Sequence, residues 1–345
     1  MAPDSVKSRR AIVAKMSKSG GMDALDPGSP APAAVPDDLL GTYRRADHYA
    51  WLASATARLR YACWNTSGTA RGTVVVLGGR GEFIEKYATE VIGELLDRGF
   101  AVMALDWRGQ GLSDRPLPDR HEAGHIDRFE TYLDDLRLFL ETVAAPANHG
   151  PLLVLAHSMG AHILLRSLAE QTSAPFAAAI LCSPMMCLHQ EAALRAIMNM
   201  IPSIPALDRR DLFSTPPFLW LARDVAANRV THDDRRFAWT DAWFKADPRL
   251  SLGGPTLGWA RQAGLSMRRT RMPGYLERVA LPVLLLTAGQ DAVVDPTFHT
   301  PVAARLKHCQ HVTIAEAHHE IMMETDAIRA QFWAAFDGLA KNVLP

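Results

Sequence analysis

Short runs of apolar residues recur along the chain, and most are followed by a stretch with helical periodicity. Segment 56–64 instead alternates polar and apolar residues, as a half-buried strand does. Uninterrupted apolar runs are typical of parallel strands covered on both faces. The pattern therefore predicts an α/β fold with a mostly parallel sheet and helices on both of its faces. The runs span 73–77, 100–105, 152–155, 176–181, 282–287 and 311–314, and the helical stretches span 83–97, 129–143, 159–171 and 326–339.

The alternation of strand and helix stops over residues 186–272, here called the insertion. It is rich in proline, arginine and tryptophan, and it holds half of the eight tryptophans of the chain. No long buried-strand run occurs in it. We therefore predict one α/β core formed by 39–185 and 273–345, interrupted by a mostly helical cap.

Residues 1–38 have a different composition from the rest of the chain. They contain five prolines and no aromatic residue. Such a segment buries too little apolar surface to offset the entropy of ordering, so we predict a disordered leader. Its first half is basic but lacks the apolar core of a secretory signal. A solvated tail and a basic arm that contacts anionic lipid heads are both compatible with it.

Composition narrows the functional classes. Lys plus Arg and Asp plus Glu are 37 each, so the formal charge is zero and a general nucleic-acid binder is disfavoured. No apolar run approaches the roughly 20 residues needed to span a bilayer. The cysteines form no CxxC pair, which indicates neither a zinc site nor a disulfide framework and favours the reducing cytoplasm. They are Cys63, Cys182, Cys187 and Cys309.

The turn after the apolar run 152–155 carries the clearest chemical signal. Residues 156–160 read AHSMG, a nucleophile-elbow pattern of the G-x-S-x-G type in which Ala156 takes the first glycine position. The strained turn needs small residues two positions before and after the nucleophile, and Ala156 and Gly160 meet that need. The alternative is an ordinary strand-to-helix turn with Ser158 as the helix N-cap. The position between a buried strand and a helix favours Ser158 as a nucleophile.

A nucleophilic serine needs a histidine base and an orienting carboxylate, which follow it in the chain as acid and then histidine. Asp291 comes just after the strand predicted at 282–287, whereas Asp295 stands before Pro296 and is better placed to cap the next helix. We predict Asp291 as the acid.

Two adjacent histidines follow the last predicted strand, 311–314. We predict His319 as the base, and His318 as a neighbour that packs or binds substrate. We interpret His157, which precedes the nucleophile, as a packed residue of the elbow and not a second base.

An oxyanion hole requires two backbone N–H donors. The residue after the nucleophile, Met159, supplies one, and the loop 77–82 after an early strand supplies the other, for which we predict the N–H of Arg80. The Arg80 side chain has two open roles. It can contact the phosphate of a substrate, or it can pair with Glu82 or Glu85.

The alternatives to a serine enzyme have weaker support. The glycines at 78–81 lack the spacing of a dinucleotide-binding loop, so no cofactor is predicted. Arg108, in the motif DWRGQGLS at 106–113, is predicted to brace the loops of the site. Histidines near the C-terminus lack the helical HExxH spacing, so no metal is predicted. The residues considered as metal ligands are His308, His311, His318, His319 and Glu320.

Together these motifs resemble the serine hydrolases of the α/β-hydrolase fold, and among them the bacterial lysophospholipase and monoacylglycerol lipase group. The resemblance covers about residues 45–340. It departs at Gly78, where monoacylglycerol lipases usually have histidine, and this favours a lysophospholipase. It rests on GRGE with EKY at 79–87, DWRGQGLS at 106–113, HSMG at 157–160, AGQD at 288–291 and HEI at 319–321.

The resemblance implies a serine ester hydrolase that cleaves a single-chain lipid ester through an acyl-enzyme, with a lysophospholipid as the foremost substrate. A monoacylglycerol lipase, a broad carboxylesterase and a catalytically silent lipid-binding protein on the same fold are the alternatives. The insertion would then be the lid that shelters the acyl chain. We expect a small lipid ester as partner, no nucleic acid and peripheral membrane contact, while the oligomeric state stays open.

Overall fold

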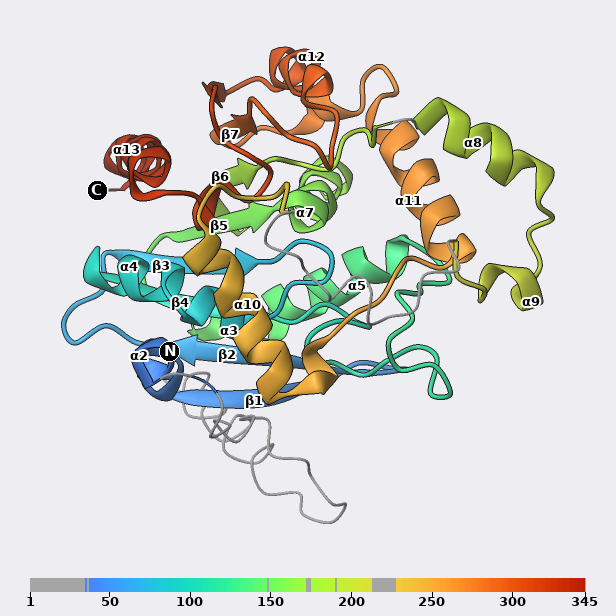
Figure 1. The fold of residues 1–345 in the computed structure, drawn as a ribbon. Coiled ribbons are helices and arrows are strands. Elements are labelled where there is room, and N and C mark those ends of the chain that lie inside the picture. Colours follow the sequence, from blue (N-terminus) through green and yellow to red (C-terminus); the bar gives the residue numbers. More distant parts are fainter. Residues whose placement is uncertain are drawn as a thin grey trace, which may run out of the picture.

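One eight-stranded sheet forms the centre of the protein. The computed structural model describes residues 35, 37–147, 149–171, 175–189, 191–212 and 228–344. The strands lie in the order β1-β2-β4-β3-β5-β6-β7-β8 (Figure 1). β1 and β2 pair antiparallel with their neighbours, and all other pairs are parallel. The strands are β1 (His48–Ala53), β2 (Arg58–Trp64), β3 (Gly72–Leu77), β4 (Phe100–Leu105), β5 (Leu152–His157), β6 (Phe176–Cys182), β7 (Val283–Ala288) and β8 (Cys309–Ile314).

The six uninterrupted apolar runs form β3 to β8, and the alternating segment forms β2. The predicted fold class is therefore confirmed. The first strand, β1, was not expected from the sequence. It is an edge strand, and only Leu52 among its side chains is buried. A strand that buries so little leaves a weak hydrophobic pattern.

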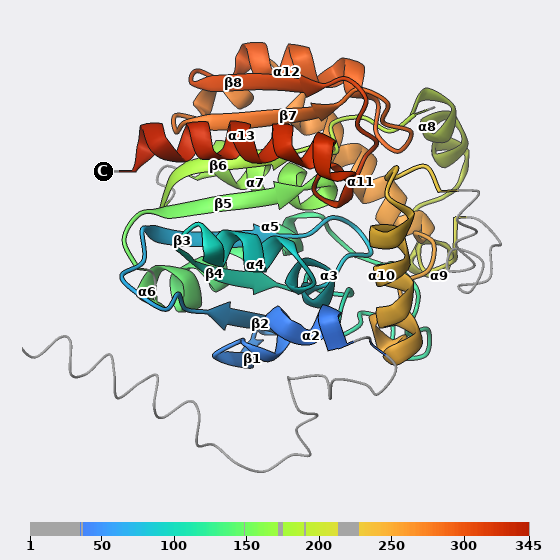
Figure 2. The same cartoon turned by 60° about the vertical axis from the view of Figure 1, so that its left-hand side comes forward.

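Two hydrophobic clusters cover the two faces of the sheet, because successive side chains of a strand point to opposite sides. In β3, Val75 and Leu77 belong to one cluster, and Val74 and Val76 belong to the other. Helices α5, α7, α11 and α12 contribute to the first cluster, and α2, α3, α4 and α13 to the second (Figure 2). This arrangement points the carboxyl ends of β3, β5, β7 and β8 toward a common edge.

The four predicted core helices occur in order, two of them altered, and no range was predicted for α2, α6 or α12. The predicted helix 83–97 is two helices, α3 and α4, because the backbone of Glu90 leaves the helical region (φ −145°). The predicted helix 129–143 is α5, which passes into a π-helical turn at Leu140–Ala144. The core helices are α2 (Asp37–Arg44), α3 (Ile84–Ala88), α4 (Val91–Asp97), α5 (Glu130–Phe139), α6 (Ala145–Ala147), α7 (Ser158–Glu170), α12 (His299–Arg305) and α13 (Asp326–Val343).

The described part of the insertion is helical and lies at the edge where the parallel strands end (Figures 1 and 2). Its helices are α8 (Glu191–Met200), α9 (Pro205–Asp208), α10 (Asp234–Ala246) and α11 (Leu257–Thr270). Trp220 falls outside the described residues. Most of the predicted leader also does, but α2 begins at Asp37, inside the range predicted as leader.

Two further expectations can be compared with the structure. Within the described ranges, no helix is both long enough and apolar enough to cross a membrane. All four cysteines are free thiols. Localisation in the reducing cytoplasm stays a prediction.

Candidate active site

Ser158 lies at the turn between β5 and α7, and its backbone is strained. Its φ is 49°, a left-handed value that is uncommon for a residue with a side chain. The turn packs closely against the loop after β3, because a Cβ at Gly160 would lie 2.8 Å from the carbonyl oxygen of Leu77. A side chain at position 160 is therefore excluded. Ala156 is fully buried in the core, so a methyl group is accommodated at the other small position.

The structure brings the three predicted triad residues together from separate loops. His319 Nε2 lies 3.0 Å from Ser158 Oγ, and His319 Nδ1 lies 2.6 Å from Asp291 Oδ2. An ionised carboxylate can only accept a hydrogen bond, so Nδ1 carries the proton and Nε2 is free to accept the hydroxyl hydrogen of Ser158. This arrangement can take a proton from the serine and hold the resulting imidazolium.

Asp291 is buried and ionised. Burial by itself would raise the pKa of Asp291, but the hydrogen bond from His319 and two backbone N–H groups lower it below the usual value. The N–H groups of Val293 and Val294 donate to Oδ1 at 2.8 and 2.9 Å. One carboxylate oxygen is thus fixed by the backbone, and the other is left to orient His319.

Asp295 and His318, the alternatives for the acid and the base, have other partners. Asp295 accepts a hydrogen bond from the N–H of Thr297 at 3.0 Å and caps a short helix, as predicted. The His318 ring stacks on His232 with 3.7 Å between the ring centroids. His318 therefore packs against the insertion, and within the described ranges it makes no hydrogen bond to Ser158 or Asp291.

The loop after β3 lies against the nucleophile. A Cβ built on Gly79 would lie 3.1 Å from Ser158 Cβ, so a side chain there would crowd the nucleophile. The N–H of Gly79 is engaged by the carboxylate of Glu82. No described group accepts from the N–H of Arg80, and Met159 stands in the first turn of α7, where backbone N–H groups lack helical partners. Both predicted oxyanion donors are thus available at the site.

A buried network of charged side chains, which the sequence pattern did not indicate, contacts the backbone of His319. His157 lies 3.1 Å from both carboxylate oxygens of Glu82, and its Nε2–H donates to the carbonyl of His319 at 3.1 Å. Lys86 pairs with Glu82 at 2.7 Å and with Glu320 at 2.8 Å. His157 therefore does more than pack in the elbow, since it holds the backbone of His319.

The charges of this network follow from its pairing. Burial alone would raise the pKa of Glu82, but His157 and Lys86 hold it well below the usual value. Burial alone would lower the pKa of His157, but Glu82 raises it. Both ring nitrogens of His157 face acceptors, so the ring is a fixed imidazolium and not a base, in line with the prediction.

Two residues of the motif at 106–113 hold the loops. Arg108 pairs with Asp135 at 2.6 Å and donates to Thr56 at 2.8 Å, which confirms its predicted bracing role. Gln110 was missed, although it stands between two glycines of the motif. Its Oε1 accepts from the N–H of Gly81, and its Nε2 lies 3.7 Å from the sulfur of Met159. Gln110 therefore joins the two predicted oxyanion elements.

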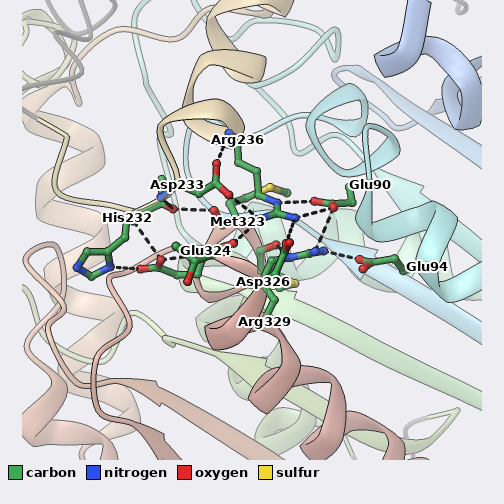
Figure 3. A network of polar contacts seen from close by, with 12 residues as sticks. Glu90, Glu94, His232, Asp233, Arg236, Met323, Glu324, Asp326 and Arg329 are labelled. Atoms are coloured by element: carbon green, nitrogen blue, oxygen red, sulfur yellow. Dashed lines mark hydrogen bonds and ion pairs between the residues drawn. The ribbon is translucent and has the colours of Figure 1, made fainter.

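The insertion is tied to the segment that directly follows His319 (Figure 3). Arg236 of α10 pairs with Glu90 at 2.6 Å and Asp326 at 2.5 Å, and it donates to the carbonyl of Glu324 at 2.8 Å. The Thr231 hydroxyl donates to the carbonyl of Met323 at 2.6 Å. These bonds hold segment 320–326, and with it the position of His319.

Within the described ranges, one set of side chains has the spacing for a metal ion, namely His232, His318 and Glu324. The Glu324 carboxylate already accepts from the N–H groups of His232, His318 and Thr325, and from His232 Nδ1. These bonds account for its charge without an ion. The set lies beside the triad and shares no residue with it.

The side chains of Ser158 and His319 are buried. Ser158 is 7% exposed and His319 is 5% exposed. A groove of about 460 Å³ lies instead beside α11, lined by residues that include Phe129, Arg166 and Met272. The Ser158 and His319 side chains are therefore largely shielded from bulk solvent.

Comparison with known proteins agrees with this geometry. A family profile described as serine aminopeptidase, S33, matches residues 68–326. Lysophospholipase L2 of Escherichia coli K12 is 33% identical over 267 residues, which cover 74% of this chain and 76% of the relative. Monoglyceride lipase of Rattus norvegicus is 27% identical over 236 residues, covering 67% and 69%. A soluble variant of monoglyceride lipase from Saccharomyces cerevisiae shares the fold, with a TM-score of 0.67, 17% identity and coverage of 85% and 95%.

Proposed function

Since this chain belongs to the serine aminopeptidase, S33, family and is a carboxylic ester hydrolase, we propose that it cleaves lysophospholipids through a triad of Ser158, His319 and Asp291. The observation that carries the triad is the pair of short contacts at His319, 3.0 Å to Ser158 and 2.6 Å to Asp291. The 33% identity to lysophospholipase L2 supports the substrate.

Each step uses groups already in place. His319 Nε2 takes the proton of Ser158 as Oγ attacks the ester carbonyl carbon. The oxygen of that carbonyl becomes negative and accepts hydrogen bonds from the N–H groups of Met159 and Arg80. The carbon–oxygen bond to the glycerol then breaks, and His319 gives its proton to the leaving oxygen. Water, deprotonated by His319, releases the fatty acid from Ser158.

The insertion is proposed to act as the cap over this site, and its outer face to contact the lipid surface from which the substrate comes. Burial of Ser158 and His319 supports the first part, because water must be excluded from the acyl-enzyme and the substrate must still be admitted. Exposed apolar side chains support the second part. They are Met200, Ile204, Leu265 and Met272, between 48% and 76% exposed.

One panel tests the function. The wild-type protein is incubated with a fluorophosphonate probe and assayed on lysophospholipids, monoacylglycerols, short aryl esters and a proline arylamide, with S158A as control. We expect labelling of Ser158 and the highest kcat/KM on a lysophospholipid. Higher values on monoacylglycerols would favour the alternative lipase, and high values on the arylamide would favour a peptidase. Absence of labelling would leave a lipid-binding protein.

A further inference from the structure

Among the described residues Arg80 has no carboxylate partner, whereas most of the buried arginines have one. Arg60, for example, pairs with Glu85 at 2.6 Å and Asp106 at 3.1 Å. The two ion pairs considered for Arg80, with Glu82 and with Glu85, do not form. Glu85 pairs with Arg60 and Glu82 pairs with Lys86 instead. The arginines with buried side chains and carboxylate partners are Arg60, Arg108, Arg166, Arg236 and Arg329.

Arg115 is the useful comparison, since it also has no carboxylate partner in the described ranges. Its guanidinium donates to the carbonyl groups of Gly109, Gly111, Arg249 and Ser251. These four contacts engage Nη1 and Nη2 of Arg115, while its Nε, like that of Arg80, is buried with no partner among the described groups. Arg115 is therefore a structural tie.

Arg80 is not satisfied in this way. Among the described groups its guanidinium donates one hydrogen bond, from Nη2 to the carbonyl of Gly253 at 2.7 Å, and its Nε is buried with no partner. Burial lowers the pKa of Arg80 to about 10, so the guanidinium is still charged at neutral pH. A buried cation without an anion is unfavourable, and such a group is stabilised when an anion arrives.

The guanidinium lies on the seam between the core and the insertion. Its central carbon is 5.1 Å from the ring centroid of Trp259 in α11. A Cβ at Gly124 would lie 3.1 Å from the same carbon, so the absence of a side chain there leaves room for the guanidinium. The backbone of Arg80 follows Gly79, which packs on Ser158. The backbone of Arg80 is therefore close to the nucleophile, and its guanidinium is separated from that backbone by the length of its own side chain.

We propose that the Arg80 guanidinium binds the phosphate of the substrate head group and so selects lysophospholipids over neutral glycerides. This rests on the proposed function. Its chemistry is the paired N–H···O contact that arginine makes with phosphate oxygens. The described residues around Arg80 provide donors, carbonyls and aromatic rings but no competing carboxylate.

The spacing within one arginine matches the spacing within the substrate. About six bonds separate the backbone nitrogen of an arginine from its guanidinium carbon. The ester carbonyl carbon of a lysophospholipid and its phosphorus are also about six bonds apart, along the glycerol. With the ester oxygen on the N–H of Arg80, the phosphate can therefore reach the guanidinium of the same residue.

The test compares two substrates with the same acyl chain, 1-oleoyl-lysophosphatidylglycerol and 1-monooleoylglycerol. For R80M we expect kcat/KM to fall about 10- to 100-fold on the lysophospholipid, chiefly through KM, because a charge-assisted contact is lost. On monooleoylglycerol the fall should be at least about tenfold smaller than on the lysophospholipid, because R80M keeps the backbone N–H that serves as an oxyanion donor. R80K should be intermediate, since it keeps the charge but not the paired contact.

R137M is the matched control. Arg137 is exposed on α5 and pairs with Asp134 at 2.7 Å, so this variant makes the same charge change at an exposed site. Its kinetics should equal wild type on both substrates. Equal losses on both substrates for R80M would mean that Arg80 only ties the insertion to the core, and this would overturn the proposal. Thermal melting of each variant separates that outcome from misfolding.

Binding to the inactive S158A protein separates this inference from the proposed function. Calorimetry with glycerol 3-phosphate and with inorganic phosphate should show binding of the first that is lost in S158A/R80M. If wild type cleaves no lysophospholipid but this Arg80-dependent binding persists, the function fails and the anion site stands. Equal binding of glycerol 3-phosphate with and without Arg80 overturns the site. Arg80-dependent binding of inorganic phosphate alone overturns the head-group assignment.

Discussion

The two described parts of the insertion meet the core in different ways. In segment 191–212, which holds α8 and α9, Met200 is 76% exposed and Ile204 is 48% exposed. In segment 228–272, which holds α10 and α11, Trp243 and Trp259 are buried and belong to the two core clusters. The second segment therefore extends the hydrophobic core through these two tryptophans, although Leu265 and Met272 of the same segment are exposed.

The polar contacts show the same difference. Arg236 in the second segment is buried and pairs with carboxylates of the core. Arg120 of the core reaches the first segment through Asp211, and both side chains are more than a third exposed. Exposed pairs contribute little, whereas breaking a buried one leaves an uncompensated charge. Segments with few buried contacts are those that move, so we expect α8 and α9, and not the whole insertion, to open the site.

The largest expected effect is the loss of activity when a triad residue is replaced. It also tests whether His318, which stacks on His232 of the second segment, takes part in catalysis. S158A and H319A should each lower kcat by roughly 10⁶-fold, because triad members act as a unit. H318A should cost far less, since His318 stacks on His232 and is not hydrogen-bonded to Ser158. The measurement is kcat on an aryl ester. A larger loss for H318A than for H319A would mean that His318, and not His319, is the base.

The next effect concerns the acid, whose main-chain carbonyl lies 3.0 Å from Nε2 of His189, a residue of the insertion that precedes the first segment. D291N should lower kcat by about 10⁴-fold, because His319 would then be held in the wrong tautomer. D295N should be mild, as Asp295 caps a short helix. The measurement is kcat of both variants on the same ester. A larger loss for D295N than for D291N would mean that Asp295 is the acid.

The third effect tests the anchoring itself. R236M should lower the free energy of unfolding by about 3 kcal/mol, because Glu90 and the Glu324 carbonyl lose a buried partner. R120M removes an exposed pair with Asp211 and should change it by less than about 1 kcal/mol. Urea denaturation measures both. Similar values would mean that the two segments are held equally.

The smallest effect concerns the exposed side chains of the first segment. M200S/I204S should leave the free energy of unfolding within about 0.5 kcal/mol of wild type, because neither side chain is buried. Activity on lysophospholipid in anionic vesicles should fall roughly tenfold, as each side chain would otherwise be buried in lipid. Activity on a dissolved aryl ester is the control. A matching loss there would argue against membrane contact.

Local pattern was sufficient for the frame of the protein. Buried parallel strands have uninterrupted apolar runs, so β3 to β8 could be placed from the sequence. Strand ends then located Ser158, Asp291 and His319, because parallel strands deliver their carboxyl ends to one edge. The break between α3 and α4 could not be predicted, since Glu90 leaves the helix where it faces Arg236 of the insertion.

What the sequence determined by itself is the set of strands and the three residues at their ends, because hydrophobic periodicity and turn chemistry are local. Only the tertiary structure decided the pairing of charges. Glu82 binds His157 and Lys86, Arg236 binds Glu90, and Arg80 has no carboxylate partner in the part of the chain that the structure describes. Such pairs join residues far apart in the chain, and a charged residue has the same appearance in a sequence whether folding gives it a partner or not.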